Sequence, residues 1–225
     1  MKNRGSIEAT KICMIVGWAG MISVIQYLLV LMLLMVFYPG GYRFSEFSIS
    51  SLGYHFSRAN SAINYIGHDI GLISDVLLLI GLYPMSILLT NHLRKYRSSH
   101  TFAWIGMILI MISLVGVILG HIYSGDVFRP QHNFFSDVFS PPYMLSVVFY
   151  SISFMLDKEY NKGYAFMGMV VAALTVFYLY VEKNAITQKL AIFSVFIWWF
   201  FQCFNMMRYY SKKKIKRMQP NPAST

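Results

Sequence analysis

Charged residues are scarce in this chain of 225 residues. Only 12% of the sequence is Asp, Glu, Lys or Arg, whereas soluble domains carry about 25%. Hydrophobic residues account for 56% and aromatic residues for 17%. A chain with so little charge and so much apolar surface is not typical of a soluble domain, and its composition predicts that its natural solvent is a lipid bilayer.

Cysteine is almost absent, and so are the short signatures of metal sites. Cys13 lies near the start of the first apolar run and Cys203 near the end of the last. Two cysteines without neighbouring ligands predict no zinc site, and their expected position towards the cytoplasm disfavours a structural disulfide. The sequence also lacks H-E-x-x-H and H-x-x-x-H patterns, so no motif by itself identifies a metallohydrolase.

Acidic residues are few, and the resulting net charge of +10 is concentrated near one end of the chain. The largest basic block, residues 212–217, directly follows an apolar run. That placement is typical of a topology signal or of contact with anionic lipids, and we expect no nucleic-acid partner. We expect residues 1–210 to form a single transmembrane domain and residues 211–225 a basic cytoplasmic tail that is frayed over 219–225.

Six apolar runs are long enough to cross a bilayer, which takes about 20 residues of helix. The predicted spans are about 12–37, 62–90, 102–122, 134–156, 164–181 and 190–210. The first run is longer than the core of a cleavable signal peptide, so we expect it to be retained. Pro141 and Pro142 interrupt the fourth run, and proline is tolerated mainly in the first turn of a helix. The predicted fold class is an all-α, polytopic integral membrane protein.

The distribution of Lys and Arg predicts the orientation of these spans. Fourteen basic residues fall in the N-terminal segment, the second and fourth connections and the tail. The five on the opposite side are Arg43, Arg58, Arg129, Lys183 and Lys189. The positive-inside rule therefore places both termini in the cytoplasm and predicts a multi-pass protein of the cell membrane.

A polar stripe in the second predicted span is the strongest indication of a functional site. Asp75 lies within this span, and a carboxylate in hydrocarbon costs at least about 2.5–3.5 kcal/mol. At about 100° per residue, Asn64, His68, Gly71 and Ser86 fall on the same side of the helix as Asp75. We therefore expect this stripe to point inward, towards protein or water.

Two long outer connections, about 38–61 and 121–142, bring further polar residues to the same end of the bundle. Long loops of this kind are more often functional than short connections are. We expect a polar cavity in the outer half of the bundle, roofed by these loops. Its candidate ligand-binding residues are Asn64, His68, Asp75, His121, Asp126, Arg129, His132 and Asn133.

Several interpretations of this constellation remain open. The cavity could bind a membrane lipid through its headgroup, or a small polar molecule, without turnover. Alternatively, His68, Asp75, His121 and His132 are candidate catalytic groups of a lipid hydrolase or remodelling enzyme. A metal would then be zinc or another divalent ion, with His68, His121, His132 and Asp126 as candidate ligands.

Two further interpretations involve no lipid chemistry. A midplane carboxylate below a histidine is also typical of proton-coupled transport, although no inverted repeat is visible. The polar side chains could instead only hydrogen-bond neighbouring helices.

In the third span, Gly116 and Gly120 form a G-x-x-x-G pattern that lets another helix approach closely, and we expect this helix-packing partner to lie within the bundle.

Three local motifs resemble those of a known family. The first is a span ending in Tyr38 and Pro39, followed by a Ser-rich stretch that closes on Leu52 and Gly53. The second is a span that opens near Asn64 and Gly67. The third is an outer loop with Gly125, Asp126, Phe128, Pro130, His132 and Asn133.

Together these motifs resemble an uncharacterised six-span membrane family, the domain of unknown function nine-nine-eight. More remotely, the pattern is similar to the eukaryotic Frag/DRAM/Sfk group of six-span proteins. The resemblance covers about Ile12 to Tyr210 and implies a six-span architecture. Because some members of the wider group are linked to lipid remodelling or lipid asymmetry, it also implies a role that involves lipids.

Overall fold

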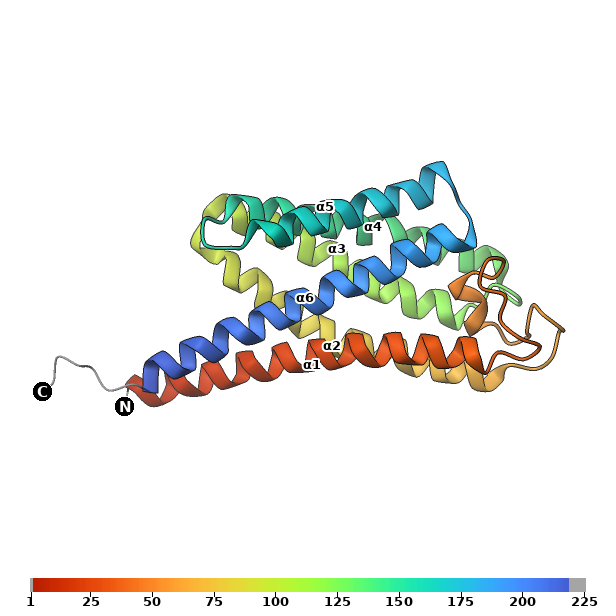
Figure 1. Cartoon of the computed structure of the whole chain (residues 1–225), viewed down its shortest axis with the longest axis horizontal. Coiled ribbons are helices and arrows are strands. Elements are labelled where there is room, and N and C mark those ends of the chain that lie inside the picture. Colours follow the sequence, from red (N-terminus) through yellow and green to blue (C-terminus); the bar gives the residue numbers. More distant parts are fainter. Residues whose placement is uncertain (1, 219–225) are drawn as a thin grey trace, which may run out of the picture.

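The computed structural model describes residues 2–218, and its regular structure is helical apart from one isolated bridge between Phe56 and Ile63 (Figure 1). The long helices are α1 (Lys2–Val36), α2 (Tyr65–His92), α3 (Arg97–Ile122), α4 (Arg129–Leu156), α5 (Lys162–Val176) and α6 (Ala185–Met218). Short helical turns are η1 (Ile49–Gly53), η2 (Leu93–Lys95) and η3 (Phe177–Val181). The predicted all-α fold is confirmed.

Six helical segments have the length and hydropathy needed to cross a membrane. They are Thr10–Val36, Tyr65–Lys95, Arg97–Ile122, Arg129–Leu156, Lys162–Val181 and Ala185–Lys212. A bilayer requires about 20 such residues per helix, and each of the six segments reaches that length. The architecture is therefore that of a multi-pass membrane protein.

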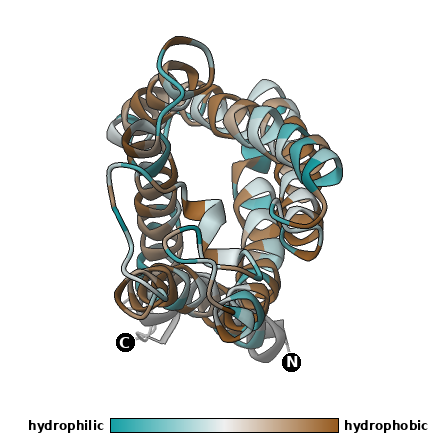
Figure 2. Cartoon of the chain, turned by 90° about the vertical axis from the view of Figure 1, so that its right-hand side faces the viewer, coloured by the Kyte–Doolittle hydropathy of each residue, from teal (hydrophilic) through white to brown (hydrophobic). Residues whose placement is uncertain are grey.

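The six helices form a closed ring. Each helix packs against the next one in sequence, and α6 returns to α1. Figure 2 shows this ring end-on, with connecting segments crossing its opening. The start of α1 and the end of α6 lie together at the opposite end of the molecule (Figure 1), which we call the terminal end. The end that carries residues 37–64 and 123–128 is called the loop end.

The fourth helix differs from the prediction. It begins at Arg129, five residues before the expected start, and continues through Pro141 and Pro142. These prolines lack the N–H groups that would bond to the carbonyls of Asp137 and Val138. A break in a helical ladder is tolerated where the backbone faces a polar cavity, and Asp137 lines the cavity described below.

The last helix also differs from the prediction, because it extends well past the expected end of the sixth span. It continues to Met218, so residues 211–218 of the predicted basic tail prolong α6 instead of forming a separate segment. The frayed end expected at 219–225 lies outside the described residues.

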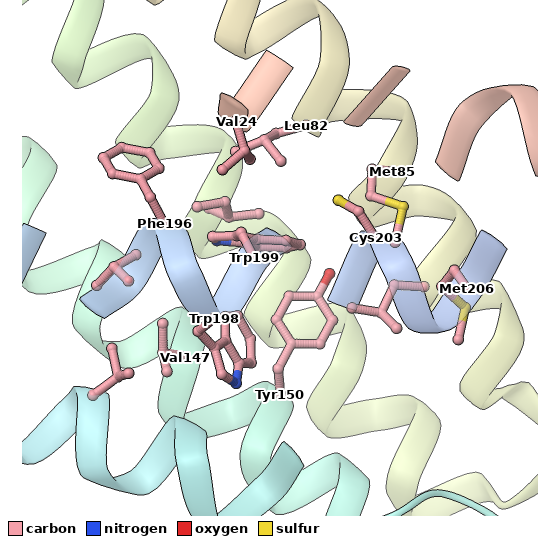
Figure 3. Packing of buried hydrophobic residues seen from close by; sticks show 14 of the residues in the cluster. Val24, Leu82, Met85, Val147, Tyr150, Phe196, Trp198, Trp199, Cys203 and Met206 are labelled. Atoms are coloured by element: carbon pink, nitrogen blue, oxygen red, sulfur yellow. The ribbon is translucent and has the colours of Figure 1, made fainter. Parts of the chain in front are cut away.

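An apolar core fills the half of the bundle nearer the terminal end. Trp198, Trp199 and Met206 of α6 are completely buried at its centre, and Leu82 and Tyr150 pack around them from α2 and α4 (Figure 3). Because lipid tails are as apolar as these side chains, the stability of this core comes mainly from close packing. The core closes the bundle beneath the cavity at the loop end.

The G-x-x-x-G pattern of α3 packs within the bundle. A Cβ atom added at Gly116 would lie 3.1 Å from the backbone nitrogen of Phe139 in α4. One added at Gly120 would lie 3.7 Å from the Cβ atom of Phe135. The small residues therefore let α3 and α4 approach each other closely, as expected for this spacing.

Candidate functional site

The two long loops meet at the loop end. The backbone N–H of Phe56 donates a hydrogen bond to Asp126 Oδ2 at 2.9 Å. Ser124 Oγ lies 2.6 Å from His55 Nδ1, and Asp126 Oδ1 lies 3.7 Å from the same nitrogen. Residues about 70 positions apart in the sequence are thus joined by polar contacts, and the side chain of Asp126 is only 14% exposed.

The environment of Asp126 favours its charged form. Burial alone would raise the pKa of this carboxyl, but the opposing contributions are together larger. Hydrogen bonds from the Ser124 hydroxyl and from the backbone amides of Phe56 and Asp126, with His55 nearby, lower its pKa below the ordinary value. Asp126 is therefore a carboxylate at neutral pH. Hydrogen bonds to a charged acceptor are stronger than those to a neutral one.

Asp75 and His121 form a buried pair between α2 and α3. Asp75 Oδ2 lies 2.8 Å from His121 Nδ1, and the two side chains are 4% and 13% exposed. His121 Nε2 donates to the carbonyl oxygen of His68 at 2.9 Å, so this nitrogen must carry a hydrogen. One further proton is shared between Nδ1 and Asp75, and the pair has no net charge wherever that proton lies. Pairing therefore offsets part of the cost of burying this carboxylate.

Two glycines make room for the His121 ring. A Cβ atom at Gly71 would lie 2.5 Å from His121 Cε1, and one at Gly53 would lie 2.8 Å from the same carbon. Any side chain at either position would displace the ring. Gly71 belongs to the polar stripe predicted for α2, and the stripe faces inward as expected, with Asn64, His68, Asp75 and Ser86 all buried.

His121 of this pair is also the last of three histidines that lie in a row. The rings of His55 and His68 stack with centroids 4.2 Å apart, and the centroids of His68 and His121 are 5.0 Å apart. His68 Nδ1 lies 3.2 Å from Asp69 Oδ1, whereas its buried Nε2 has no hydrogen-bond partner among the described residues. The row connects the first long loop to α2 and α3.

The fourth histidine of this end has a defined orientation. His132 Nδ1 lies 2.8 Å from the carbonyl oxygen of Gly120 and 3.1 Å from that of Tyr123. Because carbonyls only accept, Nδ1 carries the hydrogen, and a neutral His132 keeps its lone pair on Nε2. His132 is one of the residues that line the cavity.

A cavity of about 770 Å³ opens at the loop end, within the range of about 300–1,000 Å³ that is usual for ligand pockets. Its polar lining near the loops includes Ser50, Arg58, Asp126, Arg129, His132, Asn133, Ser136, Asp137, Ser140, Lys183 and Gln188. Its apolar lining includes Val30, Leu31, Leu34, Val117, Phe139, Ala191, Ile192, Val195 and Phe196. Asp75 of α2 and His121 of α3 also line the cavity.

Two of the predicted ligand-binding residues do not line this cavity. Asn64 donates from Nδ2 to the carbonyl oxygens of Leu52 and Tyr54, both at 3.0 Å. It therefore fixes the first long loop against the start of α2. His68 stands behind His121 in the histidine row. The other six, Asp75, His121, Asp126, Arg129, His132 and Asn133, all line the cavity.

The candidate metal ligands do not form one ligand set. Among the described residues, no group of three or more His, Cys, Asp or Glu side chains is placed to hold a metal ion. His121 uses both ring nitrogens in contacts with Asp75 and His68, and Asp126 accepts hydrogen bonds from Phe56 and Ser124. His121 and Asp126 are therefore engaged in contacts within the protein.

Sequence reasoning did not identify Lys189 as a buried residue. This side chain is 1% exposed in the first turns of α6, and its Nζ donates to the carbonyl oxygens of Phe44, Phe47 and Ala185. It thereby holds the first long loop against α6. In the sequence a lysine at the start of an apolar run is indistinguishable from an ordinary interfacial residue. Tyr27 and Ser124, which are partners of Asp75 and His55, gave no distinctive signal either.

Comparisons with protein-family models, with curated proteins and with solved structures found no match. The family resemblance of the three sequence motifs stays a prediction. The class that the fold and the cavity define is a six-helix bundle with membrane-length helices and a pocket of mixed polar and apolar lining at one end. Any function must be argued from that pocket.

Proposed function

We propose that this protein binds a membrane lipid in the cavity at its loop end. One observation carries the proposal: a single cavity of about 770 Å³ is lined both by polar residues such as Arg129 and Asn133 and by apolar residues such as Val117 and Val195. A purely polar ligand would leave the apolar wall unmatched, and a purely apolar ligand would leave buried polar groups without partners. An amphiphile matches both parts.

The two parts of the lining indicate how a lipid would lie. Its headgroup would contact Arg129, Asn133 and Ser136 on the first turns of α4, while an acyl chain would run along Val195 and Phe196 of α6. Small-molecule sites commonly combine a mostly apolar wall with a few polar groups that fix orientation.

We further propose that the protein resides in the cell membrane, with both termini in the cytoplasm and the cavity on the outer side. Fourteen basic residues on the terminal side against five on the loop side support this orientation. The long polar loops and the cavity would then face the cell exterior, where they would receive lipid from the outer leaflet.

A second candidate function is hydrolysis or remodelling of the bound lipid, and His132 is the observation that favours it. Its Nδ1 is held by two carbonyls, so Nε2 of the neutral ring keeps a lone pair on a residue that lines the cavity. Such a nitrogen acts as a general base towards water. His121 does not qualify, since Asp75 and His68 occupy both of its ring nitrogens.

Proton-coupled transport is not proposed. Leu78 and Leu82 follow Asp75 on the buried face of α2, and together with Trp199 they form an apolar layer beneath the cavity. Proton or ion pathways require polar groups or water along their length. This layer separates Asp75 from the terminal end.

The test uses a substitution that fills the cavity and a matched control. Val117 lines the cavity, whereas Val115, two residues away on α3, is 52% exposed on the outer surface of the bundle. The wild-type protein, Val117→Trp and Val115→Trp are purified in the same detergent, and the lipid retained per protein is quantified by mass spectrometry. We expect the wild type and Val115→Trp to retain about one lipid per chain, and Val117→Trp to lose it.

Equal retention by all three proteins would overturn the proposal. It would mean that the retained lipid surrounds the bundle and does not occupy the cavity. For the second candidate function, the same preparations are incubated with a diacyl phospholipid and the released fatty acid is measured. Release that His132→Asn abolishes would establish turnover, whereas release unaffected by His132→Asn would exclude His132 as the base.

A further inference from the structure

Three basic side chains from separate segments line the cavity. Arg58 comes from the first long loop, Arg129 from the first turn of α4 and Lys183 from the connection before α6, and all three line the cavity. Among the described residues none of them forms an ion pair with a carboxylate. Three separate segments therefore contribute positive charge to the lining of one cavity.

The acidic residues of the lining balance this charge only in part. Asp75 shares a proton with His121, and that pair has no net charge. Asp126 accepts hydrogen bonds from Phe56 and Ser124 and lies beside His55. Both carboxyls are engaged within the protein, so they are not free to pair with the three basic side chains.

Asp137 is the remaining acidic residue of the lining, and it lies deeper. It follows Arg129 by eight residues on α4, which places it about 12 Å further along the helix axis. Its helical neighbours Asn133, Ser136 and Ser140 also line the cavity. This stripe is suited to hydroxyl groups below a headgroup. In the rest of the lining, Arg58, Arg129 and Lys183 outnumber the one charged carboxylate, Asp126.

The start of α4 adds to the positive potential near Arg129. No side chain caps its first turn, and Pro130 occupies the beginning of the helix. The free N–H groups and the helix dipole of a 28-residue helix favour an anion near its N-terminus. Arg129 is the first residue of that helix, so the guanidinium and the dipole act in the same region.

We propose that the lipid bound in this cavity is anionic, with a phosphate or carboxylate held by Arg58, Arg129 and Lys183. This inference rests on the proposed function and names the class of its ligand. An arginine guanidinium forms paired, charge-assisted hydrogen bonds with either anion. The shared feature is a negative oxygen group on an apolar chain that occupies the deeper wall.

The test compares ligands that differ only in headgroup charge. The full-length protein, stripped of lipid in a neutral detergent, is titrated with dioleoylphosphatidylglycerol, dioleoylphosphatidylcholine or glycerol phosphate, and occupancy is read by native mass spectrometry. We expect the anionic lipid to bind at least about tenfold more tightly than the zwitterionic lipid with the same chains. Glycerol phosphate, which lacks chains, is expected not to bind at millimolar concentration.

Arg129→Gln and Lys183→Gln are each expected to weaken binding of the anionic lipid by about tenfold, the effect of losing one charge-assisted hydrogen bond. The matched control is Arg43→Gln. Arg43 lies in the same long loop as Arg58 but pairs with Glu46 outside the cavity. Its substitution is expected to leave the tenfold preference intact. Two separate variants keep the test valid if one of them fails to fold.

The outcomes distinguish this inference from the proposed function. Equal binding of both lipids, or loss of preference in Arg43→Gln as large as in Arg129→Gln, would overturn the anionic class while leaving lipid binding in place. Binding of neither lipid would overturn the proposed function itself. Glycerol phosphate binding as tightly as the anionic lipid would show a site for free anions and would also overturn the inference.

Discussion

The two ends of the bundle are built from the same helices by different means. At the terminal end, buried aromatic and aliphatic side chains such as Trp198, Trp199 and Leu82 pack into a continuous core. At the loop end, polar contacts such as that between Asp75 and His121 surround a cavity. Within α2 alone the character changes between Asp75 and Leu78. The part of α2 from Leu78 onwards packs in the core, whereas the part up to Asp75 contributes to the cavity wall.

This difference means that substitutions at the two ends should have different consequences. Replacing an apolar core residue should lower stability without changing what the cavity binds. Replacing a polar residue of the loop end should affect the roof of the cavity, the ligand, or both. The following predictions address this comparison, from the largest expected effect to the smallest.

The largest effect is expected for His121→Ala. This substitution leaves the Asp75 carboxyl buried without its imidazole partner, which costs about 3–5 kcal/mol in the free energy of unfolding. Thermal unfolding in detergent measures the loss. The control is His100→Ala, because His100 contacts Trp104 at an exposed position near the terminal end. Equal destabilisation by both substitutions would contradict the assignment of Asp75 and His121 as a buried pair.

A core substitution should give a loss of stability alone. Leu82 is completely buried, and Leu82→Ala should cost about 2–5 kcal/mol because it leaves a cavity in the core. The lipid retained per folded molecule should be unchanged. Ile80→Ala, at a position of the same helix that is 62% exposed, serves as the matched control and should have little effect. Loss of lipid in Leu82→Ala at a temperature where the protein stays folded would contradict the separation of the two ends.

A smaller effect is expected for Lys189→Met. The substitution removes the ammonium that bonds to Phe44, Phe47 and Ala185, and hydrogen bonds to a charged group contribute about 1.5–3 kcal/mol. We expect the backbone amide of Phe47 to exchange hydrogen faster in this variant than in the wild type. The substitution Lys183→Met, at an exposed lysine on the same side, should leave that exchange rate unchanged. Unchanged exchange in Lys189→Met would refute the anchoring of the loop.

The smallest effect concerns pH. The pKa of Asp126 is lowered in the folded protein, so its contribution to stability is complete above the unfolded pKa of about 3.9 and is lost as pH falls through the folded value. We therefore expect the free energy of unfolding to decrease below about pH 4, with faster exchange of the Phe56 amide. In Asp126→Asn this pH-dependent component should disappear. An unaltered pH profile in that variant would show that Asp126 does not link the loops.

Much of the fold followed from the sequence, because apolar run length is a direct measure of what crosses a bilayer. The polar stripe of α2 was also predictable, since a carboxylate such as Asp75 has to face inward. The start of α4 was not predictable, because Pro141 and Pro142 indicated a break in the helix. In the structure α4 continues through both prolines. Contacts between distant loops, such as Phe56 with Asp126, depend on tertiary packing and left no periodic signal. The burial of Lys189 was hidden for the same reason.

The central claim is that the loop end encloses a lipid with its headgroup towards the loops. The most direct measurement is an electron cryomicroscopy map of the full chain in nanodiscs that contain phosphatidylglycerol. We predict elongated density within the cavity, with its branched end beside Arg129 and its tail along Val195. A cavity filled only by water, or one that has closed by contact between α1 and α4, would contradict the account.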